Sequence, residues 1–337
     1  MKKIISLVLI ISMFQFLIAC SSGSQPSGAN ESAKSSKETI TLNAVGFLPV
    51  DDPLTASLHK WVEDVSKATE GRVQINWKGG SDVIPIAQQF DAVESGVIDV
   101  LFTYTGQYQS RAPEVLGIPL SQLQPWEERE NGFYDFMVER HQNIGVQYIG
   151  RWLTGSPRLW LNKPIDSLDQ LNGLKIRSAP AYDRLFPAVG INSVQVDPAD
   201  VYTSLQTGVV DGLVYGGLLG PRKNGWTDST KYVLDHPFWN QNCTILANLD
   251  KWNSISEADR AAVAKVTAEY ERYMVQHYTD EAQKEREELE KAGVKFIQFK
   301  SQEDADQFIK KAYDVEWEYM KKEVPDMAEK LQSLTMK

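Results

Sequence analysis

Residue types that carry redox, metal or nucleophilic chemistry are scarce in this chain. Its 337 residues include two cysteines and four histidines, and the histidines lie far apart in the sequence. The sequence has no glycine-rich phosphate loop, no HExxH zinc motif, no EF-hand loop and no G-x-S-x-G nucleophile elbow. We therefore expect no enzymatic activity, no cofactor and no metal site.

Basic residues are fewer than acidic ones. Lysine and arginine total 35 against 45 aspartates and glutamates, which gives a formal net charge of −10. An acidic surface disfavours nucleic acid and electrostatic docking on anionic lipid, although it leaves room for a local anion site. The hydrophobic share of 42% is ample for a core, and the length suggests two domains.

The N-terminus has the pattern of a bacterial lipoprotein. Two lysines precede the apolar run 4–19, which is typical of a secretory signal and short for a membrane span. The run ends in Leu17-Ile18-Ala19-Cys20, as in a lipobox, where the cysteine is diacylated and becomes the new N-terminus. An ordinary signal peptide that happens to contain a cysteine is the alternative. Seven of the eighteen residues in 21–38 are serine and none is large and apolar, so we expect a flexible tether.

The remainder alternates between strand and helix patterns, which favours an α/β fold with largely parallel sheets. We expect strands at 39–46, 72–77, 97–102, 146–152, 157–162, 174–178, 193–196, 209–215, 244–249 and 294–299. We expect helices at 53–69, 86–94, 182–189, 198–206, 257–292 and 303–323.

Two features suggest two facing lobes. Residues 96–101 (GVIDVL) have an echo in residues 208–213 (GVVDGL), although common helix–turn–strand chemistry would give the same similarity. The helix at 257–292 would be roughly 54 Å long, enough to run along both lobes. We assign residues 39–155 plus 244–283 to the first lobe, and residues 156–243 plus 284–337 to the second. Ligands in such folds bind beyond the carboxyl ends of the strands.

Arg177 is the strongest candidate for a binding residue. It stands at the end of a short apolar run, about thirty residues before a helix, a glycine turn and a second apolar run. Its guanidinium is a planar, permanently charged fork that fits a carboxylate with two parallel hydrogen bonds. A structural salt bridge is the alternative role for this arginine.

The same stretch resembles the substrate-binding proteins of TRAP (tripartite ATP-independent periplasmic) transporters. The similarity lies in GLKIR at 173–177, VYTSLQTGVVDG at 201–212, GVIDVLF at 96–102 and the segment 231–236. It extends over nearly the whole chain from Thr41 onward. The resemblance implies a two-lobed fold like that of periplasmic binding proteins, with a cleft between the lobes and a long helix spanning both.

The resemblance also implies a set of ligand-binding residues. Arg177 stands at the position that bridges the ligand carboxylate, and Arg158 matches an upstream arginine that often assists. The chain departs from familiar members in having aromatic residues where polar ones are common, among them Tyr104 and Tyr215. With Tyr108 and Trp152 also near the rim, the site would suit a flatter or more apolar acid. Trp152 could equally be a core residue, and Arg158 a surface charge.

The function implied is that of an extracytoplasmic solute receptor. It would bind a small organic acid, close like a hinge and deliver the acid to the TRAP permease subunits in the membrane. The lipid on Cys20 would anchor it, facing the periplasm or the outside of a cell with one membrane. An ABC-type binding protein and a ligand-sensing receptor for a signalling system are the alternatives.

Overall fold

The computed structural model describes residues 39–153, 155–240 and 243–336. The chain divides into two compact units, Met1–Lys37 and Glu38–Lys337, and all described residues belong to the second. The predicted signal peptide, the lipidated Cys20 and the tether lie outside the described residues. No helix among the described residues is long and apolar enough to cross a membrane.

The first lobe is built on a five-stranded sheet with the order β2-β1-β3-β10-β4. Its strands are β1 (Ile40–Gly46), β2 (Val73–Trp77), β3 (Val100–Tyr104), β4 (Val146–Arg151) and β10 (Cys243–Asn248). Strand β1 pairs in parallel with β2 and β3, whereas β10 is antiparallel to both β3 and β4. The expectation of a largely parallel sheet is therefore wrong. Strand β10 returns to this sheet after the chain has built most of the other one, and it enters from the opposite end.

The second lobe is built on a six-stranded sheet with the order β11-β9-β5-β8-β6-β7. Its strands are β5 (Arg158–Leu161), β6 (Lys175–Ser178), β7 (Asn192–Gln195), β8 (Gly212–Tyr215), β9 (Tyr232–Leu234) and β11 (Lys295–Ile297). Strand β6 pairs in parallel with β7 and β8, and β5 is antiparallel to β8 and β9. This sheet is thus mixed as well.

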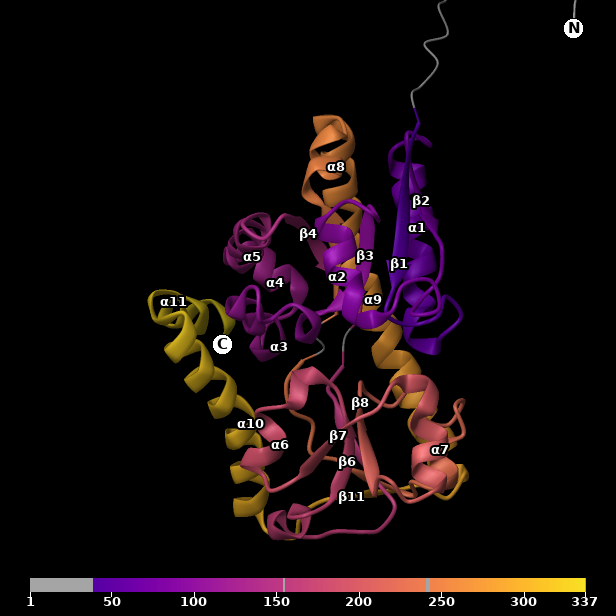
Figure 1. Ribbon diagram of the computed structural model, residues 1–337, viewed down its shortest axis with the longest axis vertical. Helices are drawn as coiled ribbons and strands as arrows, with labels where there is room; N and C mark the ends of the chain where they lie inside the picture. Colours follow the sequence, from indigo (N-terminus) through magenta and orange to yellow (C-terminus); the bar gives the residue numbers. More distant parts are fainter. Residues whose placement is uncertain (1–38, 154, 241–242, 337) are drawn as a thin grey trace, which may run out of the picture. The chain divides into compact units, whose positions relative to one another are not determined.

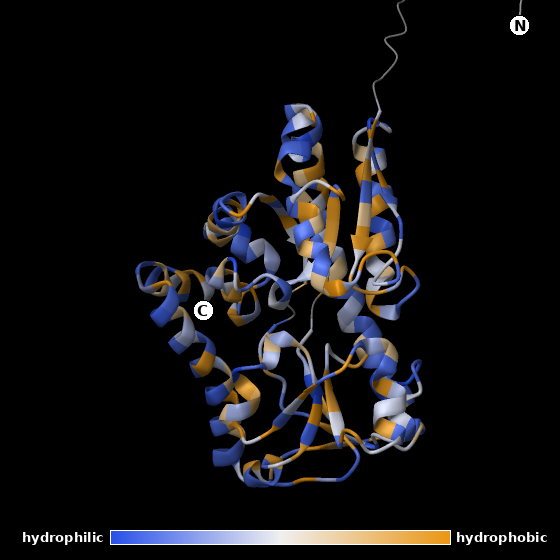
Figure 2. Cartoon of the chain, in the orientation of Figure 1, coloured by the Kyte–Doolittle hydropathy of each residue, from blue (hydrophilic) through white to orange (hydrophobic). Residues whose placement is uncertain are grey.

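Helices surround both sheets (Figure 1). They are α1 (Ala56–Ala68), α2 (Ile86–Glu94), α3 (Gly117–Leu120), α4 (Pro125–Glu130), α5 (Phe133–Gln142), α6 (Leu185–Ala188), α7 (Val201–Gln206), α8 (Leu249–Ser254), α9 (Glu257–Lys291), α10 (Gln302–Glu323) and α11 (Pro325–Thr335). Strand β3 is predominantly hydrophobic, whereas the long helices α9 and α10 carry hydrophobic and hydrophilic residues side by side (Figure 2). Each such helix buries its apolar stripe and leaves its polar side to water.

Helix α9 confirms the long helix that the sequence predicts. It has 35 residues, and the Ser256 hydroxyl accepts a hydrogen bond from the backbone N–H of Asp259 at its start. The helix packs against α1, α4 and β4 of the first lobe and against β11 of the second. A rigid element shared by both lobes constrains how they can move relative to one another.

The sequence echo marks the same local structure in both sheets. Gly96 and Gly208 have φ values of +77° and +71°, which favour glycine. Three residues after Gly96, the Asp99 carboxylate accepts a hydrogen bond of 2.8 Å from the backbone N–H of Asn43 in β1. Three residues after Gly208, the Asp211 carboxylate accepts a hydrogen bond of 2.9 Å from the backbone N–H of Lys175 in β6. These turns delay the strands, so β3 and β8 begin three residues later than predicted.

Helix α11 is a second departure from the sequence-based assignment. It packs against α3 and α5, which belong to the segment between β3 and β4. The Asn131 side chain donates a hydrogen bond of 2.8 Å to the Leu334 carbonyl, and Leu331 is fully buried. Assigning all of 284–337 to the second lobe is therefore wrong for this helix, because its apolar face is covered by first-lobe residues. The other lobe boundaries stay a prediction.

A buried hydrogen-bonded chain in the first lobe predicts sensitivity to acid. His141 is fully buried, with Nε2 3.0 Å from the Tyr108 hydroxyl and Nδ1 2.7 Å from the Met137 carbonyl oxygen. Burial lowers the pKa of His141 to about 4, although the bond to Met137 acts in the opposite direction. The unfolded chain, with an ordinary histidine pKa near 6.5, binds the proton more readily than the native state.

We expect the stabilising contribution of neutral His141 to be complete above pH 6.5 and to be lost as the pH falls toward 4. The loss amounts to about 3 kcal/mol of unfolding free energy for this one residue. Urea titrations at a series of pH values compare the wild type with His141→Gln, in which a neutral amide that does not titrate replaces the imidazole. If the wild type and the variant lose the same stability between pH 7 and 4, His141 is not the responsible group.

Candidate ligand-binding site

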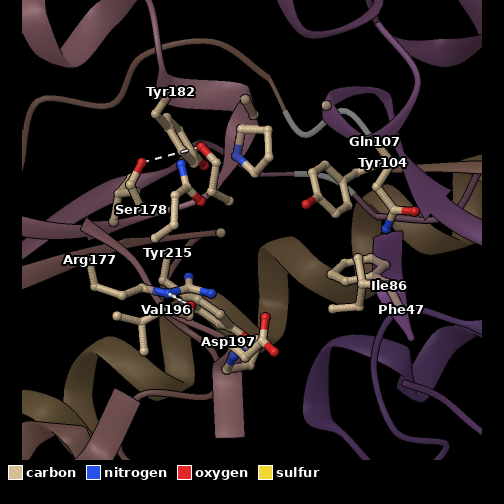
Figure 3. A pocket seen from close by; sticks show the side chains of 18 of the residues that line it. Phe47, Ile86, Tyr104, Gln107, Arg177, Ser178, Tyr182, Val196, Asp197 and Tyr215 are labelled. Atoms are coloured by element: carbon tan, nitrogen blue, oxygen red, sulfur yellow. Dashed lines mark hydrogen bonds between the residues drawn. The ribbon is translucent and has the colours of Figure 1, made fainter. Parts of the chain in front are cut away.

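A cavity of about 810 Å³ is lined by residues from both lobes. Its walls come from the carboxyl ends of parallel strands, with Tyr104 at the end of β3, Arg177 in β6 and Tyr215 at the end of β8. Figure 3 shows Phe47, Ile86, Tyr104 and Gln107 on one side, and Arg177, Ser178, Tyr182, Val196, Asp197 and Tyr215 on the other. The arrangement follows the rule that α/β folds bind ligands beyond these strand ends.

Arg177 is the main cationic feature of the cavity. Its side chain is buried, and Nε donates a hydrogen bond of 2.8 Å to the Val196 carbonyl oxygen. The two terminal nitrogens make no hydrogen bond or ion pair with any residue that the structure describes, and the guanidinium points into the cavity (Figure 3). Burial lowers the pKa of Arg177, although the neighbouring Tyr215, Tyr104 and Tyr182 act in the opposite direction. A buried positive charge whose two terminal nitrogens stay free of described partners is suited to an anion.

Three tyrosines share the cavity with this guanidinium. Tyr104 comes from the first lobe, and Tyr182 and Tyr215 come from the second; all three line the cavity. Their hydroxyls make no hydrogen bond with the described part of the chain. Burial raises the pKa of Tyr104 to about 12, despite the opposing effect of Arg177, and raises the pKa values of Tyr182 and Tyr215 further. Each phenol is therefore neutral and can donate a hydrogen bond.

Aromatic packing holds the tyrosine rings in place. Tyr182 stacks on Trp239 with a centroid distance of 5.7 Å, and Tyr215 meets the edge of Trp226 at 5.0 Å. On the facing lobe, Tyr104 packs edge-on against Phe47 at 5.0 Å. Rings fixed in this way lose little side-chain freedom when a ligand binds.

Arg158 does not line the cavity, so the expectation that it assists Arg177 is wrong. Its Nε donates to Asp235 at 3.0 Å and its Nη1 to the Ser156 carbonyl at 3.0 Å. Asp235 also accepts a hydrogen bond from Arg286. Burial acts to raise the pKa of Asp235, but the two arginines lower it more, so the pKa lies below its usual value. The reason is the strand pairing, because β5 lies beside β9 and brings Arg158 next to the residue that follows β9.

Tyr108 and Trp152 do not line the cavity either. Tyr108 is fully buried, stacks on Phe90 and hydrogen-bonds His141. Trp152 is fully buried and donates to the Thr103 carbonyl at 3.3 Å. Both are core residues, which for Trp152 was the alternative interpretation.

Several lining residues carry no sequence signal strong enough to identify them. Tyr182 follows Arg177 by five residues in a short 3-10 helix, Pro180–Tyr182, and Gln107 ends another, Thr105–Gln107. Neither amide atom of Gln107 is accessible to solvent or hydrogen-bonded to a described residue. The one sequence feature that points to these residues is that both turns lie within a few residues of the end of a predicted strand. Within the described ranges, no group of three acidic, histidine or cysteine side chains could hold a metal ion.

Comparison with known proteins gives a consistent picture. The family model of bacterial extracellular solute-binding proteins, family 7, matches residues 45–323. A monocarboxylate 2-oxoacid-binding periplasmic protein of Nostoc is 24% identical over 64% of this chain, and the match spans 61% of that relative.

Two solved structures have the same fold. A TRAP periplasmic solute-binding protein of Desulfovibrio salexigens with bound orotic acid superposes with a TM-score of 0.78 at 20% identity, covering 88% of this chain and 97% of that one. An extracytoplasmic solute receptor of Bordetella pertussis that binds pyroglutamic acid gives 0.76 at 17% identity, covering 88% and 99%.

The position of Arg158 leads to a prediction about stability. Arg158→Gln removes a partly buried ion pair but leaves Asp235 with Arg286, so we expect the unfolding free energy to fall by about 1 kcal/mol. Thermal or urea unfolding measures this. An unchanged stability would show that Arg286 alone satisfies Asp235.

Proposed function

Because this chain belongs to the bacterial extracellular solute-binding proteins of family 7, we propose that it binds a small organic acid through its carboxylate and delivers it to a TRAP-type secondary transporter. The observation that carries this proposal is the Arg177 guanidinium, held by Val196 with both terminal nitrogens free of described partners inside the cavity. A carboxylate there would receive two parallel charge-assisted hydrogen bonds.

Capture of the carboxylate would draw on neutral donors as well as charge. The hydroxyls of Tyr104, Tyr182 and Tyr215 belong to residues that line the same cavity as Arg177 and have no described partner, so they can donate to the anion or to the body of the ligand. Each charge-assisted bond contributes roughly 1.5–3 kcal/mol net. The aromatic walls favour a flat or apolar body over a heavily hydroxylated one.

Ligand binding would favour the arrangement in which the lobes are together. Besides the cavity walls, the lobes meet through the Gln109 side chain, which donates to the Pro180 carbonyl at 3.2 Å and accepts from Arg184 at 2.7 Å. Lys223 donates to the Asp51 carbonyl at 3.1 Å. A ligand that contacts both lobes stabilises this state over an open one by the difference in its binding energies.

Attachment to the membrane would come from the N-terminal segment. We propose a lipid on Cys20 and a flexible tether over 21–38, whose random-coil reach is on the order of 20–25 Å. The partners would be the membrane subunits of the transporter, on the extracytoplasmic face. Such a tether would keep the receptor at the membrane while it moves between ligand and permease.

Arg177→Lys tests the carboxylate clamp. Lysine keeps the charge but loses the planar fork, so we expect affinity to fall by about 100-fold, which corresponds to about 2.7 kcal/mol. A thermal-shift screen with orotate, pyroglutamate, 2-oxobutanoate and benzoate selects the tightest acid, and calorimetry compares the variants. Arg158→Lys, outside the cavity, serves as the matched control. Wild-type affinity in Arg177→Lys would exclude the proposed role.

The protonation states of the site predict the pH dependence of binding. Arginine stays charged, and burial keeps the phenol of Tyr104 neutral up to a pKa of about 12. We therefore expect the affinity for a carboxylate to vary less than twofold between pH 6 and 9.5, measured by calorimetry with the acid chosen above. A tenfold loss within this range would mean that another titrating group faces the ligand.

A further inference from the structure

We propose that this receptor selects amino carboxylates, zwitterions in which an ammonium group accompanies the carboxylate bound by Arg177, and that Asp197 receives the ammonium group. This inference rests on the proposed function of the same cavity and adds a second charged contact to it. It is carried by two observations. The charged residues of the cavity wall are mostly acidic, and an unpaired Asp197 follows the residue that holds Arg177.

The charges of the cavity wall do not match a simple anion. Arg177 is the only basic residue among the described residues that line the cavity, whereas Asp197 and Asp200 are both acidic. Neither aspartate side chain makes an ion pair or a hydrogen bond with a residue that the structure describes. A ligand that is only an anion would meet one opposite charge and two like charges. A ligand that also carries a positive group would leave less charge unpaired.

Asp197 lies next to the anion site. Strand β7 ends at Gln195, Val196 accepts the hydrogen bond of 2.8 Å from Arg177 Nε, and Asp197 is the next residue. Figure 3 shows Asp197 beside Val196, on the wall of the cavity that carries Arg177. Burial lowers the pKa of Arg177, and the charge of Asp197 is among those that act in the opposite direction. One small zwitterion could therefore pair with both side chains.

The carboxylate of Asp197 is open to a ligand. The residue is exposed, and it lines both this cavity and an adjoining one of about 660 Å³. It stands at the N-cap position of the 3-10 helix Pro198–Asp200, yet its side chain makes no capping hydrogen bond. Asp52 in the adjoining cavity differs, because its carboxylate accepts a hydrogen bond of 2.8 Å from the backbone N–H of Leu54. Asp197 is thus the acid beside Arg177 whose side chain has no described partner to give up.

Aromatic rings near Asp197 define the rest of the ligand. Phe47 and Tyr215 line both cavities, as Asp197 does, and Tyr104 and Tyr182 line the first. Rings of this kind pack against an apolar side chain, whereas the two charged groups of the ligand need charged partners. The ligand class is therefore an amino carboxylate with an apolar side chain, for which phenylalanine and leucine are suitable probes.

Pairs of acids that differ only in the positive group test the inference. Both enantiomers of phenylalanine are compared with 3-phenylpropanoate, and both enantiomers of leucine with 4-methylpentanoate. A third pair, 4-(trimethylammonio)butanoate and 5,5-dimethylhexanoate, has one shape and places the positive charge further from the carboxylate. In at least one pair we expect the ammonium compound to bind roughly tenfold more tightly, which is the effect of one charge-assisted contact. Calorimetry on the lipid-free mature protein measures the ratios.

Asp197→Asn separates an ionic contact with the ligand from a structural role. We expect the variant to lose the preference for the ammonium compound. The matching acid without that group should bind equally or more tightly, because a like charge near the ligand is removed. A residue with a merely structural role would instead weaken both members of a pair by the same factor. Asp250→Asn, at the exposed start of α8, makes the same chemical change outside the cavity and should alter neither affinity.

Failure of this inference can be told apart from failure of the proposed function. The inference alone is overturned if an acid of the earlier panel binds in a way that depends on Arg177 but no ammonium compound binds more tightly than its counterpart. Absence of binding by every member of the three pairs, or an unchanged preference in Asp197→Asn, would overturn it as well. If no acid in either set shows binding that depends on Arg177, both the inference and the proposed function are wrong.

Discussion

The site depends on one hydrogen bond, from Arg177 Nε to the carbonyl oxygen of Val196. This bond fixes the plane of a buried guanidinium and leaves its two terminal nitrogens directed into the cavity. Val196 can accept it because β7 runs parallel to β6, with Arg177 opposite Val194 and Ser178 opposite Gln195. Val196, which holds the cation, therefore directly follows the strand next to the one that carries Arg177. A guanidinium held in this way would lose little rotational freedom on binding an anion.

The rest of the molecule can be understood as support for that cation. Parallel pairing of β6, β7 and β8 brings Arg177, Val196 and Tyr215 to the same end of one sheet. The equivalent pairing of β1 with β3 places Tyr104 and Phe47 on the facing lobe. Burial in this aromatic setting strengthens the field of the charge, because the effective dielectric constant is lower than in water. The same burial keeps the surrounding phenols neutral, so they do not compete with a ligand for the guanidinium.

The sequence was informative about the fold and about one side chain of the site. Hydrophobic periodicity located most strands and the 35-residue helix α9, and the motif at 173–177 drew attention to Arg177, which lines the cavity. It was less informative about Arg158, which carries the same charge at a strand start but pairs with Asp235. Nothing local distinguishes the two arginines, because their partners lie 77 and 19 residues away in the chain. The local sequence likewise does not distinguish Tyr104 from Tyr108, since the turn between them directs Tyr104 toward the cavity and Tyr108 into the core.

By itself the sequence determined the family, the alternation of strands and helices, the acidic balance of charge and the presence of an arginine suited to a carboxylate. These follow from composition, periodicity and a long local motif, which are properties of neighbouring residues. Only the tertiary structure decided which side chains face that arginine, that β10 joins the first sheet, that α11 covers the first lobe, and that Gln107 remains without a described partner. Those outcomes depend on contacts between residues far apart in the chain, where strand pairing and packing determine which polar groups are satisfied.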